Sequence, residues 1–217
     1  MTIPSSRAKQ PLKEQAYVYV KKMILDEIVP ANSFLSERNL AAQLGMSKTP
    51  IRLAIARLEH EGFVRVSPQQ GIVVVSLTFD EILDYIEYRL ALESFVVGNL
   101  CSRIQPEQIR MLEAHLLEHQ KLVQTNQREA QVYADMGFHG LLAKLNGNQQ
   151  IVSALLRQQA MLYRVAMRIF EKHPKRAPAS LEEHHLLVEA ISSGQKKEAL
   201  ELIEKHILNI KTLLVGN

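Results

Sequence analysis

Four side chains in the second half of the sequence have the types and spacing of a metal site. Asp135 and His139 are four residues apart, so they share one face of any helix that contains them. His184 and His206 each fall in a row of apolar residues at helical spacing, so both are expected to face inward. One carboxylate and three converging imidazoles suit a borderline divalent cation, with zinc expected first and nickel or manganese as alternatives.

The spacing alone leaves a second interpretation of these histidines open. His115 and His119 are also four residues apart, and His185 competes with its neighbour His184 for the inward position. A buried histidine is more often a hydrogen-bonded core residue than a metal ligand. The residues by themselves therefore leave a metal site and a set of core histidines as alternatives.

A second group of side chains, in the first third of the chain, is suited to DNA. The group consists of Ser47, Lys48, Thr49 and Arg52 at the start of one helix, Arg38 near the start of the helix before it, and Gln70 and Gly71 in a turn. Cations can meet phosphates, polar side chains at a helix start can reach base edges, and a glycine lets the backbone approach the sugar-phosphate chain. Each arginine alone could equally be a solvated surface cation. Their clustering in one motif favours DNA recognition.

Three helices and a hairpin must position this second group, and the sequence predicts them in that order. Apolar periodicity predicts helices over residues 12–28, 36–44 and 49–62, and β-branched runs predict strands over residues 63–66 and 72–75. Ser36 and Thr49 are the expected N-caps of the second and third helices. Three helices with a tight turn between the last two, followed by a hairpin, indicate a winged helix-turn-helix.

The chain after Ser76 has helical patterning and no strand signal. The expected helices cover residues 78–100, 106–123, 129–145, 149–172, 180–193 and 196–214. Thr78 and Ser180 each begin a capping-box sequence, T-x-x-E and S-x-x-E, and so are expected to open two of these helices. The short connections imply an all-α antiparallel bundle, so the fold class is mainly α.

Composition and charge fit two domains with different roles. The 217 residues are 47% hydrophobic and 23% charged, which is enough to bury two small cores. Residues 1–77 hold ten basic and six acidic residues, a net charge of +4, whereas the remaining 140 hold sixteen and seventeen, a net charge of −1. The positive excess therefore lies in the part suited to a polyanion. We divide the chain into a tail (1–11), a DNA-binding domain (12–76) and a helical domain (78–215).

The single cysteine and the lack of long apolar segments indicate in which cellular compartment the protein is found. Cys101 has no second cysteine with which to form a disulfide, which fits a buried thiol in a reducing environment. The N-terminal sequence has no apolar signal segment, and no uncharged stretch is long enough to span a bilayer. We therefore expect a cytoplasmic protein that does not contact a membrane.

Residues 12–76 resemble the winged-helix domain of the GntR transcriptional regulators. The matching residues run from Leu35 to Ala41 and from Leu44 to Arg52, and include Ala54, Leu58, Glu61, Gly62 and Gly71. The residues that by this resemblance contact an operator are Arg38, Lys48, Thr49, Arg52 and Gly71. Two positions depart from the usual pattern: Leu35 replaces a common proline, and Lys48 replaces an arginine, exchanging a bidentate fork for a point charge.

Residues 78–215 resemble the FCD ligand-binding domain of the FadR-type branch of that family. The matching residues are Glu87, Tyr88, Arg89, Leu92, Glu93, Asp135, Phe138, His139, Asn148, Glu183, His184 and His206. In metal-binding members one Asp and three His hold the cation, which implies this role for Asp135, His139, His184 and His206. Members that bind fatty acyl-CoA lack this set, which argues against that ligand.

Two arginines of the helical domain are candidates for contact with an anionic effector. Arg89 would either face the ligand pocket or form an ordinary salt bridge with a neighbouring acid, and the sequence weighs these equally. Arg164, in the long fourth helix of the domain, is a second candidate. The resemblance thus implies a small carboxylate effector beside a divalent cation, in a domain that also dimerises.

Together these features indicate a ligand-responsive DNA-binding regulator, expected to be a repressor and not an enzyme. A metal-dependent hydrolase would normally carry a general base near the cation, and no H-E-x-x-H motif occurs. An architectural DNA-binding protein whose helical domain only dimerises is the other alternative. Because one winged helix reads few base pairs, we expect a homodimer on a pseudo-palindromic operator.

Overall fold

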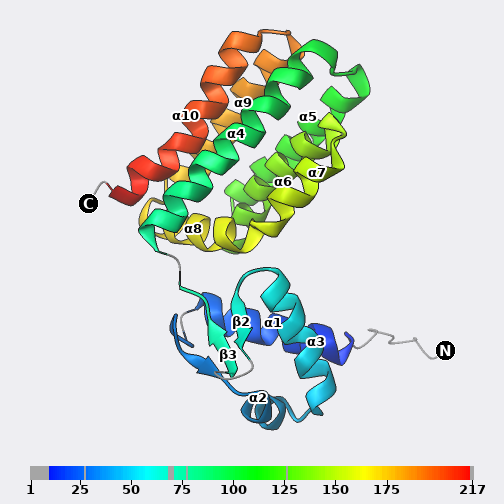
Figure 1. Ribbon diagram of the computed structural model, residues 1–217. Helices are drawn as coiled ribbons and strands as arrows, with labels where there is room; N and C mark the ends of the chain where they lie inside the picture. The colour runs from blue at the N-terminus through cyan, green and yellow to red at the C-terminus, as the bar shows by residue number, and fades with distance from the viewer. Residues whose placement is uncertain (1–9, 27, 68–70, 77, 126, 216–217) are drawn as a thin grey trace, which may run out of the picture. The chain divides into compact units, whose positions relative to one another are not determined.

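The computed structural model describes residues 10–26, 28–67, 71–76, 78–125 and 127–215 (Figure 1). The chain divides after Ser76 into two compact units, the first with a small antiparallel sheet and the second built of helices. The predicted fold class, a winged helix-turn-helix followed by an all-α domain, is confirmed. None of the described helices is long and apolar enough to cross a membrane.

The first unit contains three helices and three short strands. These are α1 (Leu12–Leu25), β1 (Phe34–Leu35), α2 (Glu37–Leu44), α3 (Lys48–His60), β2 (Val64–Ser67) and β3 (Gly71–Val74). The strands form one antiparallel sheet in the order β1-β3-β2, with Ile72 opposite Leu35 on one side and Val66 on the other. The sequence prediction missed β1, because a two-residue strand shows no alternation that could reveal it.

The helix ends of the first unit differ from the predicted ones by up to three residues. Ser36 caps α2 as expected, since its hydroxyl accepts the Asn39 N–H at 3.4 Å. However, α3 begins at Lys48 with Ser47 in the N-cap position, so Thr49 is already inside the helix. α1 ends at Leu25, before the predicted end at residue 28. Pro30 disfavours helical backbone at the residue before it, so the chain leaves the helix before reaching the proline.

The second unit contains seven helices among the described residues. These are α4 (Phe79–Arg103), α5 (Pro106–Val123), α6 (Arg128–Asn146), α7 (Gln149–Arg157), α8 (Gln159–Lys172), α9 (Arg176–Ser192) and α10 (Lys196–Val215). α4 lies along α10, and α6 contacts α4, α5, α7, α8 and α9 (Figure 1). Helices from the beginning, middle and end of this unit therefore share one core, whose fully buried members include Val97, Leu112, Phe138, Ile191 and Ile203.

Two predictions about these helices were wrong. The single helix expected over residues 149–172 is two helices that part at Gln158, where the backbone (φ −100°, ψ 4°) leaves the helical region. Apolar periodicity continues across this point, so the pattern gave no sign of the break. Ser180 does not open a helix, because α9 begins at Arg176 and Ser180 lies inside it, where its hydroxyl donates to Asp135. By contrast, Thr78 and Glu81 form the expected capping box of α4.

Candidate metal centre

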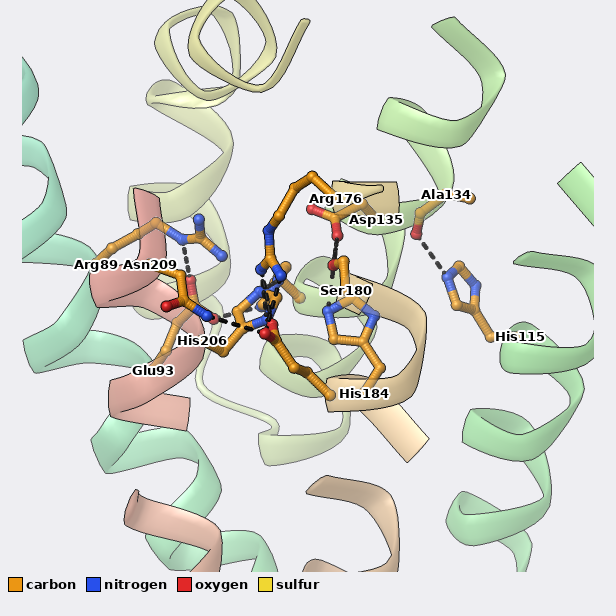
Figure 2. Close-up of polar contacts among 12 residues, drawn as sticks. Arg89, Glu93, His115, Ala134, Asp135, Arg176, Ser180, His184, His206 and Asn209 are labelled. Atoms are coloured by element: carbon orange, nitrogen blue, oxygen red, sulfur yellow. Dashed lines mark hydrogen bonds and ion pairs between the residues drawn. The ribbon is translucent and has the colours of Figure 1, made fainter. Parts of the chain in front are cut away.

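The four predicted metal ligands lie together in the helical unit. Asp135 and His139 come from α6, His184 from α9 and His206 from α10, and one ligand atom of each lies within 4.8 Å of the others. All four side chains are buried. The one-turn spacing on α6 supplies two donors from a single helix, and the contacts of α9 with α6 and α10 supply the other two (Figure 2).

Two of the imidazoles are held by carboxylates on the side away from the cluster. His139 donates its Nδ1–H to Glu93 Oε2 at 2.6 Å, and His206 donates its Nδ1–H to Glu183 Oε2 at 2.6 Å. This fixes the tautomer, because an Nδ1 that carries the proton leaves Nε2 with a free lone pair. The two Nε2 atoms lie 3.1 Å apart. At that distance both nitrogens can bind the same cation.

Both supporting glutamates are ionised, as this arrangement requires. Burial would raise the pKa of Glu93, but the Arg89 guanidinium and the His139 ring lower it overall. Burial would also raise the pKa of Glu183, but hydrogen bonds from His206 and Arg176 lower it to about 2. Three donors converge on Glu183: the His206 ring, the Arg176 guanidinium with two bonds at 2.9 and 2.7 Å, and the Asn209 amide at 2.9 Å (Figure 2).

The other two donors also have the character of ligands. Among the described residues, neither ring nitrogen of His184 has a hydrogen-bond partner, although the side chain is fully buried. Leaving such nitrogens unsatisfied is costly, and coordination of a cation would satisfy one of them. Burial and the neighbouring His206 and His139 rings lower the pKa of His184 well below its usual value, so the ring is neutral. Its Nε2 lies 3.7 Å from Asp135 Oδ1.

Asp135 supplies the negative charge of the cluster. Burial opposes its ionisation, but the His139 and His206 rings and the Ser180 hydroxyl lower the pKa of Asp135 overall. The donor set is thus one carboxylate and three imidazole nitrogens, the chemistry that borderline divalent cations prefer. These residues fit such a cation.

A cavity of about 310 Å³ adjoins the cluster and reaches His139. Arg89 and Glu93 of α4 line it on one side, and their ion pair joins Arg89 Nε to Glu93 Oε1 at 2.5 Å. Arg89 is only 1% exposed, and its Nη2 has no hydrogen-bond partner among the described residues. The two roles that the sequence left open for Arg89 therefore coexist, since it forms a salt bridge and also faces the cavity.

The remaining candidates of the helical unit lie outside the cluster. Arg164 of α8 is half-buried and is not among the described residues that line the cavity. His115 bonds through Nε2 to the Ala134 carbonyl oxygen at 2.8 Å (Figure 2). His185 is exposed. His119 is fully buried, and its ring lies 5.8 Å from that of His184, but it is not part of the ligand cluster.

Sequence reasoning gave no role at the site to Glu93 or Glu183, although both matched the FCD pattern. It expected Glu183 to complete the capping box of Ser180, which the start of α9 at Arg176 rules out. The spacing of Arg89 and Glu93, four residues apart in an otherwise apolar row, was an available sign of a buried charged pair. No comparable sign marks Glu183, because its partners Arg176, His206 and Asn209 lie 7, 23 and 26 residues away.

The predicted DNA-contacting residues of the first unit lie on its surface. Those within the described residues are all exposed: Arg38, Ser47, Lys48, Thr49, Arg52 and Gly71. Gln70 lies outside the described residues. Arg52 Nε donates to Glu37 Oε2 at 2.9 Å, a contact between exposed groups that ties α3 to α2. Gly71 has a φ of 80°, a conformation that glycine adopts without strain.

Two protein-family models match the chain. Residues 12–74 match the bacterial regulatory proteins of the gntR family, and residues 84–209 match the FCD domain. The two matches fall within the two structural units, the first in the winged helix and the second around the candidate metal centre. Two different family models therefore match the two candidate sites. One covers the exposed polar residues on α3, and the other covers the buried candidate ligands in the bundle.

Individual proteins support the same assignment. The HTH-type transcriptional regulator YdhC of Bacillus subtilis is 25% identical over 91% of this chain and 87% of its own length. The HTH-type transcriptional repressor RspR of Escherichia coli K12 is 24% identical over 87% of this chain and 81% of its own. The solved structure of E. coli McbR/YncC has the same fold, with a TM-score of 0.73 at 22% identity over 95% of this chain and 98% of its own. This chain therefore belongs to the GntR family of bacterial transcriptional regulators, and within that family to the proteins that carry an FCD domain.

Proposed function

We propose that this regulator binds one divalent cation in its helical domain through Asp135, His139, His184 and His206, and that a small carboxylate effector binds beside it. The observation that carries the proposal is the pairing of the His139 and His206 rings. Each has its Nδ1 proton held by a carboxylate, and their Nε2 atoms face each other at 3.1 Å. Zinc is the first candidate, and nickel and manganese are the alternatives.

An anion is the expected effector because of the charge balance around the cluster. A bound divalent cation would add two positive charges beside the single carboxylate of Asp135, leaving a net positive centre. Arg89 lines the adjoining cavity, and its Nη2 has no hydrogen-bond partner among the described residues. A carboxylate that binds the Arg89 guanidinium would lie close to the centre. Arg164 is a second candidate for contact with such an anion.

The winged helix is proposed to read an operator as one half of a homodimer. Arg38, Ser47, Lys48, Thr49, Arg52, Gln70 and Gly71 are the proposed DNA contacts. A two-fold dimer requires a two-fold site, so the operator is expected to be a pseudo-palindrome. The E. coli relative RspR is a transcriptional repressor. We propose repression for this chain too, and a cytoplasmic location, where its DNA would be.

An effector can change operator affinity only if it binds two arrangements of the protein unequally. Arg89 and Glu93, which line the cavity, lie on α4, the helix that begins directly after the division between the two units. A carboxylate bound by Arg89 would therefore contact α4, the helix that follows the winged-helix unit most closely along the chain. We propose α4 as the element through which effector binding is communicated.

The direct test of the cation site is metal content. Purified wild type should carry about one equivalent of divalent metal by elemental analysis, and His139→Ala and His184→Ala should carry much less. His185→Ala is the matched control, because this neighbouring histidine is exposed and outside the cluster. Absence of stoichiometric metal from wild type after incubation with zinc, nickel and manganese, or full retention by both cluster variants, would mean that these are core histidines.

A further inference from the structure

The cavity beside the candidate metal centre has two unlike walls. α4 contributes polar groups, namely the Tyr85 hydroxyl and the Arg89–Glu93 pair. α7 and α8 contribute four aliphatic side chains, Val152, Leu155, Leu156 and Leu162, and one amide, Gln159. A ligand that fills this space meets a buried cation at one side and hydrocarbon at the other, so an amphipathic molecule fits it best.

The polar wall is built for a single acidic group. Arg89 is fully buried, its Nε is taken by Glu93, and its Nη2 has no partner among the described residues. Lys144 also lines the cavity, but its side chain is exposed and therefore hydrated. Arg176, the other buried cation at the cluster, is not among the described residues that line the cavity. One buried cation in the described lining favours one carboxylate there.

α6 also lines the cavity, and one of its lining residues is a glycine, Gly140. Met136, Gly140 and Lys144 follow one another at four-residue steps along the cavity. A Cβ on Gly140 would meet no atom within 4 Å outside its own helix and chain neighbours. Gly137, also in this wall, is different, because a Cβ there would lie 3.0 Å from His115 Cε1. Packing thus explains Gly137 but not Gly140.

Glycine in the middle of a helix destabilises it relative to alanine. Gly140 has no positive φ and no close neighbour that would require glycine. Its effect on the molecule is the space that it leaves in the cavity wall. A side chain at this position would project into that space, since helical residues four apart share a face.

We propose that Gly140 opens the part of the cavity that receives the apolar body of the effector. The effector is then a small monocarboxylate with an aliphatic or aromatic body, its acid group at Arg89 and its body between Gly140 and the leucines of α7. The volume of about 310 Å³ limits that body to a small one. This inference rests on the proposed function and narrows the chemical class of its effector.

Calorimetric titration of the metal-loaded full chain with acetate, butyrate and hexanoate tests this. Each added methylene should tighten binding about fourfold until the cavity is filled, which corresponds to about 0.8 kcal/mol per buried CH₂. Adipate and citrate serve as polar comparisons and should bind more weakly than hexanoate. Benzoate tests whether an aromatic body is accepted as well.

Gly140→Val should remove the gain with chain length while leaving metal content and acetate affinity unchanged. Gly140→Ala should give an intermediate gain and a higher Tm than wild type, because alanine favours the helix and meets no obstacle. Ala114→Val is the control for a β-branched residue in a helix, since Ala114 is exposed on α5 and does not line the cavity.

The inference would be overturned if affinity did not change with the length of the carboxylate's carbon chain. It would also be overturned if Gly140→Val left that length dependence unchanged. Tighter binding of adipate or citrate than of hexanoate would overturn it too, while leaving the proposed carboxylate effector in place. If no carboxylate binds, both the inference and the proposed effector are wrong. Metal content and operator binding of the same samples then decide separately on the rest of the proposed function.

Discussion

Glu183 is the residue whose replacement probes the candidate metal centre most selectively, because it is not itself a proposed ligand. Its Oε2 accepts the His206 Nδ1–H at 2.6 Å, and both of its oxygens accept from Arg176. Glu183→Gln keeps the size of the side chain but replaces one acceptor oxygen by an NH₂ donor. The amide cannot satisfy His206 and both Arg176 donors in the same way.

Two consequences of Glu183→Gln weaken the site. If the amide nitrogen faces His206, the ring loses its acceptor, and a shift of the ring proton to Nε2 blocks the ligand atom. If the amide oxygen stays on His206, Arg176 loses part of its counter-charge, and its Nη2 lies only 3.3 Å from His206 Nδ1. Loss of such a supporting partner typically weakens metal binding by about 10- to 100-fold. That is about 1 to 3 kcal/mol of binding free energy.

The assay is competition for zinc between the protein and a chromogenic chelator of known affinity. Glu182→Gln is the matched control, since it removes the same charge from an exposed neighbouring position. Far-UV circular dichroism and Tm of the metal-free variants separate loss of the site from loss of the fold. Zinc affinity within twofold of wild type, or an equal loss in Glu182→Gln, would refute the idea that Glu183 positions a metal ligand.

Three further expectations follow from the two units. Arg52→Ala should cost specific operator binding about 1–3 kcal/mol, the value of a lost base contact. It should also flatten the salt dependence in an anisotropy titration. Tm should be unchanged, because the pairing of Arg52 with Glu37 is exposed. The full chain should be a dimer by light scattering, alone and on a pseudo-palindromic duplex, and a monomer in both states would contradict this. The pKa of Glu183, about 2 when folded against 4.5 when unfolded, contributes roughly 3 kcal/mol to the stability of the metal-free protein above pH 4.5. That contribution should be lost as pH falls from 4.5 through 2, and acid titration of Glu183→Gln followed by circular dichroism should show a smaller loss over this range.

The sequence predicted the ligand cluster because helical periodicity carries most of the information needed. Asp135 and His139 share a helix face at any packing angle, and the apolar rows around His184 and His206 fix which way these side chains point. The residues alone left core histidines as an alternative, and the resemblance to the FCD domain implied that the four lie together. The sequence left His185 in competition with His184, and the structure distinguishes them, since the first is exposed and the second buried.

The sequence could not predict the role of a side chain whose partner lies far away along the chain. Ser180 has the sequence context of a helix cap, yet it lies inside α9 and donates to Asp135, 45 residues earlier in the chain. The break at Gln158 carries no glycine or proline to mark it. In both cases tertiary contacts override a local preference, which is a weak determinant when packing competes with it.

The space between helices is the property that a local sequence pattern describes least. Periodicity predicts that a helix face is buried but not whether side chains fill the volume in front of it. Gly140 interrupts an otherwise filled face of α6, and only the absence of atoms within 4 Å of its virtual Cβ distinguishes it from Gly137, which packing explains. Arg89 is likewise half of an ion pair, and the structure shows in addition that it lines the same cavity. If the proposed metal site and effector are correct, substitutions at cavity positions such as residue 140 would change the choice of effector without changing the proposed ligands.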